Sequence, residues 1–308
     1  MSDTTIGLLH PGEMGAAVGQ CLTAAGHEVL WLAAGRSPAS AARAEAAGLT
    51  AAASLADLAG RSEMIVSVCP PQGALDVARA VAGTGFGGVY VDANAVAPGT
   101  AREAAGIVRD AGFVDGGIIG TPPVAPGFIR LYLSGARAAE VEELFEGTPV
   151  RTIVIDHSSV GPGAGAGVHA NANAGAGAGA GADQDGIGLA SAVKMAYAAW
   201  TKGSAALLLN VRALARAEGM EDMLLAEWGI SQPGLEARSV GAAGAAAVKG
   251  WRWIAEMEEI AATMAAAGLP EGFHQAAAEI YRRFSPTDSA GKQAGLDALV
   301  RNSPDRSD

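Results

Sequence analysis

The first 32 residues show the pattern of a strand, a tight turn, a helix and a second strand. Residues 6–9 are apolar, a turn follows at residues 10–12, and the helix after it is predicted to end at a C-cap glycine, Gly26. A second apolar run, residues 28–32, follows at once. In dinucleotide-binding domains this layout places the N-terminus of a helix, with its free N–H groups and partial positive charge, against a pyrophosphate. The unit therefore predicts such a domain; an ordinary βα turn of another α/β protein is the alternative.

The glycine pattern of this turn is incomplete. In the spacing G-x-G-x-x-G the first glycine falls on His10, whereas Gly12 and Gly15 match. Gly12 would let the backbone approach a phosphate, and Gly15 would let the helix pack close to the strand. The residues predicted to hold the cofactor phosphates are His10, Pro11, Gly12, Glu13, Met14 and Gly15.

The end of the second strand bears on the choice of cofactor. An NAD site usually has Asp or Glu here for the ribose 2′-hydroxyl, but no acidic residue occurs between Glu28 and Glu45. Arg36 and Ser37 instead suit a 2′-phosphate, through a charge-assisted contact and a hydroxyl hydrogen bond. The sequence therefore favours NADP(H) over NAD(H); a solvent-exposed loop arginine is the alternative reading of Arg36.

Further apolar runs continue the pattern of a doubly wound parallel sheet, with helices predicted between them. The predicted strands cover residues 64–68, 88–92, 113–115, 131–135 and 151–155. In this fold ligands lie at the carboxyl ends of the strands, so Cys69 and Pro70 are expected to line the cofactor site. Cys69 is interpreted as a small wall residue rather than a nucleophile. The amide of Asn94 would bind cofactor or substrate, or cap the next helix as an Asx turn.

Three glycines follow the strand predicted at residues 113–115. The stretch Asp115-Gly116-Gly117 leaves backbone N–H groups uncovered. Such groups can hold a substrate carboxylate or phosphate. Asp115, Gly116 and Gly117 are therefore predicted to bind substrate.

The composition changes sharply after residue 160. Residues 161–185 are nearly all Gly and Ala and show no apolar periodicity, so they are predicted to be a flexible insertion. Residues 186–302 are predicted to be an all-helical domain for substrate binding and dimerisation, following a nucleotide-binding domain at residues 1–160. Its helices are expected at residues 187–217, 223–228, 236–248, 251–267 and 272–284.

Charge and cysteine content exclude several classes of protein. The net charge is −11 and the pI is about 4.9, which argues against a nucleic-acid-binding surface. The two cysteines form no disulfide framework and no metal-ligand spacing, so no metal is expected. Neither a signal peptide nor a long apolar span is predicted, and a cytoplasmic location is expected.

Lys194 is the candidate catalytic residue. It lies near the start of the long helix predicted at residues 187–217, just after the insertion that joins the two predicted domains. A lysine that is partly desolvated there would have a lowered pKa and act as a general acid or base. The alternative is a surface lysine with its stem along apolar neighbours.

The motifs together resemble the β-hydroxyacid dehydrogenase and 6-phosphogluconate dehydrogenase superfamily, in a branch whose helical C-terminal domain is of poorly known function. They are residues 10–15, 69–71, 92–100, 115–117 and 191–197, with 194–203 and 251–259 carrying the likeness to the branch. The resemblance implies NAD(P)H binding, proton transfer by Lys194 and a homodimer formed through the helical domain. The superfamily usually has Asn one turn after the lysine, where this chain has Ala198.

The predicted activity is hydride transfer between NADP(H) and a small, anionic hydroxy or keto substrate. An imine reductase on the same scaffold is the first alternative, and a non-catalytic NADP-binding sensor is the second. Tyr197 joins Lys194 as a candidate catalytic residue. Ser191, Trp200 and Thr201 join the Gly-Gly stretch as predicted substrate contacts.

Overall fold

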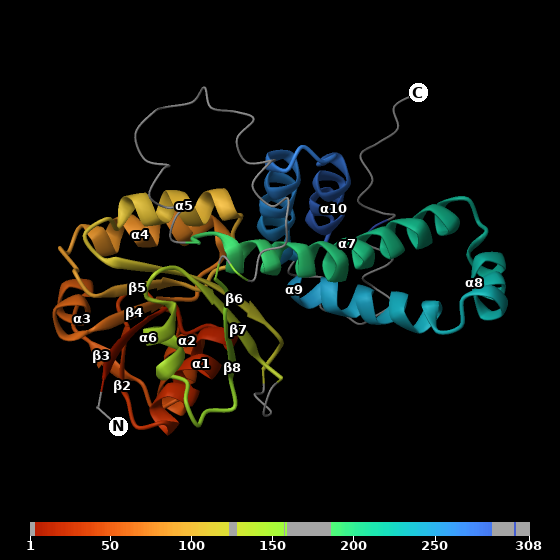
Figure 1. Cartoon of the computed structure of the whole chain (residues 1–308). Helices are drawn as coiled ribbons and strands as arrows, with labels where there is room; N and C mark the ends of the chain where they lie inside the picture. Colours follow the sequence, from red (N-terminus) through yellow and green to blue (C-terminus); the bar gives the residue numbers. More distant parts are fainter. Residues whose placement is uncertain (1–3, 123–127, 157, 159–185, 285–298, 300–308) are drawn as a thin grey trace. The chain divides into compact units, whose positions relative to one another are not determined.

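The computed structural model describes residues 4–122, 128–156, 158, 186–284 and 299 (Figure 1). The insertion predicted at residues 161–185 lies outside the described residues. Residue contacts divide the chain into two units, Met1–Met195 and Ala196–Asp308. The domain boundaries predicted at residues 160 and 186 stay a prediction.

The first unit is built on one sheet of eight strands. They are β1 (Thr5–Leu9), β2 (Glu28–Leu32), β3 (Thr50–Ala52), β4 (Met64–Ser67), β5 (Val89–Asp92), β6 (Gly112–Ile119), β7 (Arg130–Ser134) and β8 (Arg151–Val154). Their order is β3-β2-β1-β4-β5-β6-β7-β8. All neighbouring pairs are parallel except β6 and β7, which are antiparallel. The predicted doubly wound sheet is confirmed.

Helices cover both faces of this sheet (Figure 1). They are α1 (Glu13–Ala24), α2 (Pro38–Ala46), α3 (Leu55–Arg61), α4 (Ala74–Ala82), α5 (Pro98–Ile107) and α6 (Ala138–Glu143). One apolar core joins the strands to α1, α2 and α6, and a second core joins them to α3, α4 and α5. In β4, for example, Val66 belongs to the first core and Ile65 to the second. Burial on both faces explains why such strands are continuously apolar in the sequence.

Strand β6 is longer than predicted. The sequence indicated a strand at residues 113–115 with the glycines after it, but Gly116 and Gly117 lie inside β6 and pair with Leu133 and Tyr132 of β7. The predicted end of the strand was wrong because glycine has a low intrinsic strand propensity, and the tertiary pairing with β7 overrides it.

The second unit is helical. Helix α7 (Leu189–Ala217) begins in the first unit, and α8 (Glu221–Ser231), α9 (Leu235–Ala266) and α10 (Gly272–Arg282) follow. The two helices predicted at residues 236–248 and 251–267 are a single helix, α9, which continues through Gly250. A Cβ at Gly250 would lie 3.6 Å from side-chain atoms of Tyr281 and Phe284, so this glycine is buried where α10 packs. That packing offsets the roughly 1 kcal/mol that a glycine costs within a helix.

Polar contacts join the helices of the second unit. Lys202 of α7 forms an ion pair with Glu256 of α9, and the Tyr281 hydroxyl of α10 donates a 2.6 Å hydrogen bond to the Lys202 carbonyl. Arg212 of α7, which is buried, forms an ion pair with Glu221. None of the helices in the described ranges is both long and apolar enough to cross a membrane.

Candidate cofactor and active site

The turn between β1 and α1 accepts a histidine at the position of the missing glycine. His10 has φ 67° and is the one described residue other than glycine with a positive φ. Histidine is among the residues that tolerate this region best. The His10 carbonyl accepts a 2.7 Å hydrogen bond from the Gly12 amide, and a Cβ at Gly15 would collide with the same oxygen. Gly15 is therefore required by the turn itself.

The N-terminus of α1 has room for an anion. Its N-cap residue is Gly12, and no side chain caps the helix by a hydrogen bond. A Cβ at Gly12 would have no neighbouring atom within 4 Å, so the space beside this residue is open. An open, uncapped helix N-terminus after the first strand suits the pyrophosphate of a dinucleotide.

The His10 imidazole is held neutral. Burial, together with the nearby charge of Arg36, lowers the pKa of His10 from 6.5 to about 4. Its Nδ1 atom is buried and has no hydrogen-bond partner among the described residues. A neutral ring at this position adds no charge to the turn near pH 7.

Two arginines and two serines are placed beside this turn. Ser37 caps α2 and accepts a 3.3 Å hydrogen bond from the Ser40 amide. Arg43 of α2 donates to the Ser40 hydroxyl (3.2 Å) and to the Pro11 carbonyl in the turn (3.4 Å). The buried Nε of Arg36 has no hydrogen-bond partner within the described ranges. These groups fit a 2′-phosphate, which would supply the missing acceptor.

The sequence interpretation named Arg36 and Ser37 but missed Ser40 and Arg43. The sequence contained a signal for these two residues, because residues 37, 40 and 43 are spaced by three and so share one face of α2.

The ends of β4 and β5 are tied together by Asn94. Its Oδ1 accepts a 2.6 Å hydrogen bond from the Cys69 amide, and its Nδ2 donates to the Ser67 hydroxyl at 3.2 Å. The Asx-turn interpretation of Asn94 was wrong, because the N-cap residue of α5 is Ala97 and has no side-chain cap. A cofactor contact by this buried amide stays a prediction.

The Cys69 thiol is not an activated nucleophile. Burial is the largest cause that raises its pKa to about 12, and the charge of Asp92 acts in the same direction. A thiol with so high a pKa carries almost no thiolate near neutral pH. This supports the interpretation of Cys69 as a wall residue at the end of β4.

Helix α7 is anchored to β6 by Asp115. The Asp115 carboxylate accepts hydrogen bonds from the Ser191 hydroxyl (2.6 Å) and amide (2.9 Å), the Gly188 amide (3.0 Å) and the Ser134 hydroxyl (3.1 Å). Asp115 and Ser191 are both fully buried. In this structure their polar atoms bind one another and the start of α7, and their predicted contact with substrate stays a prediction.

Lys194 packs against β6 at Gly117, two residues beyond Asp115. A Cβ at Gly117 would lie 2.7 Å from the Ala190 carbonyl oxygen and 3.1 Å from the Lys194 Cβ. The absence of a side chain at Gly117 therefore lets α7 lie directly on β6. Lys194 itself is half-buried. The close approach of Lys194 to Gly117 could not be predicted from the sequence pattern.

The other residues predicted near Lys194 belong to the second unit. Tyr197 and Trp200 are exposed, and the Thr201 hydroxyl donates to the Tyr197 carbonyl of its own helix at 3.1 Å. Ala198 is buried. The proposed roles of Tyr197, Trp200 and Thr201 stay predictions. In the described parts of the chain, no group of His, Cys, Asp and Glu could hold a metal ion.

Two family models match the chain. Residues 5–96 match the family of coenzyme F420-dependent NADP oxidoreductases, and residues 215–284 match a domain of unknown function, DUF1932. A curated but uncharacterised 28.5 kDa protein of Methanothermus fervidus is 31% identical over 170 residues, which are 55% of this chain and 54% of that protein. The chain thus matches about half the length of this relative.

Solved structures share the fold over nearly the whole chain. The conserved protein MTH1747, described as similar to 3-hydroxyacid dehydrogenases, is 24% identical with a TM-score of 0.60, covering 96% of this chain and 99% of that one. The 3-hydroxyisobutyrate dehydrogenase of Mycobacterium tuberculosis is 15% identical with a TM-score of 0.64, covering 97% and 99%. A reductive aminase from Aspergillus terreus is 18% identical with a TM-score of 0.52, covering 96% and 98%. At these identities the likeness is one of fold.

The chain joins a segment that matches NADP oxidoreductases to a helical segment that matches DUF1932, and it has the fold that 3-hydroxyacid dehydrogenases share. The fold that the superfamily resemblance implied is confirmed. The match of residues 5–96 to NADP oxidoreductases supports NADP(H) as the cofactor.

Proposed function

We propose that the protein transfers hydride between NADP(H) and the carbonyl or hydroxyl carbon of a small anionic substrate, with Lys194 as the general acid and base. The observation that carries this proposal is the contact of Lys194 with Gly117 on β6. This contact places Lys194 beside the C-terminal half of β6. In doubly wound folds, ligands bind beyond the carboxyl ends of the strands.

Different residues would bind the cofactor and transfer the proton. The N-terminus of α1 at Gly12 would hold the pyrophosphate, and Arg36 with Arg43 would hold the 2′-phosphate. Bound NADPH supplies the hydride. In reduction, the Lys194 ammonium donates a hydrogen bond to the carbonyl oxygen and gives up its proton as negative charge develops there; in oxidation, the neutral amine accepts that proton.

A homodimer formed through the helical unit is part of the same proposal. Of the thirteen large apolar side chains that are exposed among the described residues, eleven lie in the second unit. Ile230, Met223 and Trp200 are at least 70% exposed. Exposed apolar side chains in such number are typical of a surface that another chain covers.

The activity is tested by following NADPH oxidation with three substrate sets: 2- and 3-keto acids, uncharged ketones and preformed cyclic imines. Turnover of the keto acids well above that of the uncharged ketones is expected. Faster turnover of imines would favour the reductase alternative. An absence of turnover in every set, with NADPH binding intact, would contradict the proposal and favour a sensor.

A further inference from the structure

Two arginines lie side by side at one corner of the sheet. Arg130 is the first residue of β7, Arg151 is the first residue of β8, and the two are register partners. Arg130 is half-buried and Arg151 is exposed. Like charges that face each other directly across two strands are destabilising. No salt bridge of either arginine with another described residue is present.

The strand register places Arg130 on the same face of the sheet as Lys194. In the antiparallel ladder of β6 and β7, Gly117 pairs with Tyr132 and Ile119 pairs with Arg130. Paired residues share a face, and so do residues two apart along a strand. Because Lys194 packs over Gly117, Tyr132 and Arg130 lie on the face that α7 covers. Arg151 shares this face through its pairing with Arg130.

Burial along β7 agrees with this assignment. Leu131 and Leu133 point to the opposite face, into the core with α1, α2 and α6. Tyr132, between them, is only half-buried. Among the residues that the structure describes, no hydrogen bond from the Tyr132 hydroxyl is present, so the phenol is available to a ligand.

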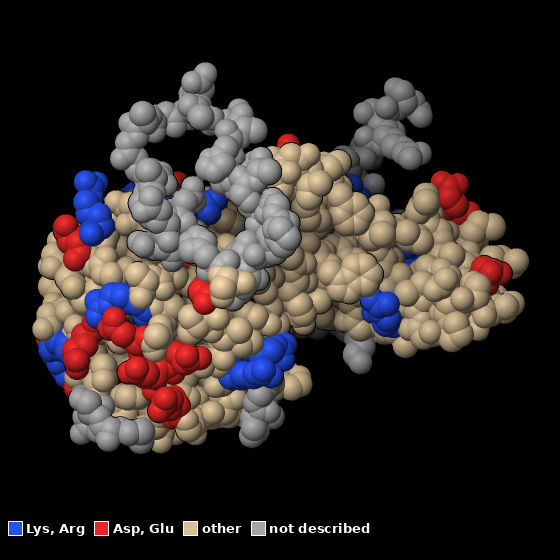
Figure 2. All heavy atoms as spheres, viewed as in Figure 1, with Lys and Arg blue, Asp and Glu red and all other residues tan. Residues whose placement is uncertain are grey.

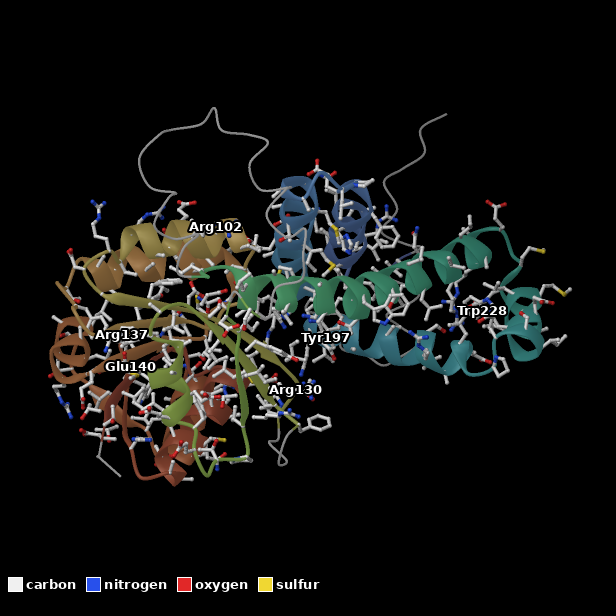
Figure 3. All side chains as sticks on the ribbon, viewed as in Figure 1. Arg102, Arg130, Arg137, Glu140, Tyr197 and Trp228 are labelled. Atoms are coloured by element: carbon white, nitrogen blue, oxygen red, sulfur yellow. The ribbon has the colours of Figure 1, made fainter. Side chains whose placement is uncertain are left out.

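The two arginines also lie at the ligand-binding edge of the sheet. Ile119, the partner of Arg130, is the last residue of β6. Strand β6 runs parallel to β5, so its end faces the same edge as the turn after β1. Figure 3 shows Arg130 far from Arg137, and Figure 2, in the same view, shows a group of Lys and Arg side chains on the surface of the first unit.

We propose that Arg130 and Arg151 form a subsite for an oxyanion of the substrate, a carboxylate or a phosphate, with Tyr132 between this subsite and Lys194. The identity of the ligand as substrate rests on the proposed function. Arg130 lies two residues along the strand, or about 7 Å, from the position beside Lys194. A carboxylate or phosphate can accept bidentate hydrogen bonds from a guanidinium, and its charge would relieve the repulsion between the two arginines.

The test measures anion binding apart from turnover. Succinate and inorganic phosphate are titrated calorimetrically, at constant ionic strength, into the full chain saturated with NADP⁺. The variants are Arg130→Gln, Arg151→Gln and Tyr132→Phe. Arg137→Gln is the matched control, because Arg137 lies at the other end of β7 and forms a two-point ion pair with Glu140 (2.7 and 2.6 Å). Circular dichroism confirms that each variant is folded.

At least tenfold weaker binding of one probe is expected for Arg130→Gln. Smaller losses are expected for Arg151→Gln, whose arginine is exposed, and for Tyr132→Phe, and no loss for Arg137→Gln. Binding of succinate would identify the ligand group as a carboxylate, and binding of inorganic phosphate would identify it as a phosphate. Absence of binding to the wild type, or equal binding by wild type and Arg130→Gln, would overturn the subsite. Anion binding without turnover of any carbonyl would overturn the proposed function instead, and leave the subsite standing.

Discussion

Lys194 is the residue on which the proposed chemistry depends. Lys194→Ala should lower the rate of hydride transfer by roughly 10²–10⁴, which is the usual contribution of a positioned acid or base. NADPH affinity should stay nearly unchanged. Lys194→Arg should not restore the rate, because a guanidinium keeps its proton near neutral pH. Single-turnover absorbance at 340 nm (the NADPH band) measures the step. Wild-type turnover by the Ala variant would refute the assignment and make Tyr197 the next residue to test.

The two arginines beside the turn should determine the preference for NADPH. Arg36→Ala should weaken NADPH binding by about 1–3 kcal/mol, the worth of a charged hydrogen bond, and leave NADH binding unchanged. Arg43→Ala should weaken both cofactors, since Arg43 also contacts the Pro11 carbonyl of the turn. Fluorescence titration gives both dissociation constants. Arg61→Ala, which removes a surface ion pair with Glu28, is the control. Equal or tighter binding of NADH by the wild type would contradict this prediction.

His10 should contribute to the acid sensitivity of the fold. Its pKa is about 4 in the folded chain against 6.5 ordinarily, so between these values the unfolded chain binds more protons. The free energy of unfolding should therefore decrease as the pH falls from 6.5 towards 4. His10→Asn removes the titration and keeps a residue that tolerates positive φ. Urea denaturation at pH 7 and pH 5 should show a smaller difference for this variant; an identical difference would speak against the effect.

At the scale of elements, the contact of α7 with β6 requires a glycine. Gly117→Ala should destabilise the fold by about 1–3 kcal/mol, a typical cost of overpacking, because the new methyl group meets the Ala190 carbonyl. The rate of hydride transfer should fall as well, since Lys194 moves with the helix. Gly106→Ala in α5 is the matched control, because a Cβ there has no neighbour within 4 Å. Chemical denaturation and turnover are measured together, and unchanged values for Gly117→Ala would show that α7 does not depend on this contact.

At the scale of the whole molecule, the exposed apolar side chains of the helical unit should support a dimer. Ile230→Glu together with Met223→Glu should shift the protein towards a monomer, because both side chains of α8 are at least 70% exposed. Val154→Glu on β8, another exposed apolar residue, is the control. Light scattering after size-exclusion chromatography gives the mass. A wild type that is monomeric at micromolar concentration would contradict the dimer.

Elements with local signals could be predicted from the amino-acid sequence. Continuous apolar runs predicted the strands of the doubly wound sheet, and the turn at residues 10–12 with Gly15 predicted the start of α1. The same is true of the long helix that carries Lys194. Such elements are predictable because side-chain periodicity, glycine φ preferences and helix caps act within a few residues of one another.

Features that depend on partners distant in sequence became visible only in the folded chain. Gly116 and Gly117 became strand because β7 pairs with them, and α9 continued through Gly250 because α10 packs there. Asp115 and Ser191 are 76 residues apart in sequence, and their hydrogen bond, which anchors α7, is visible only in the folded chain. The arginine pair at the start of β7 and β8 is likewise a product of strand register. No local pattern encodes such pairings, since their free energy comes from groups that meet only when the chain is folded.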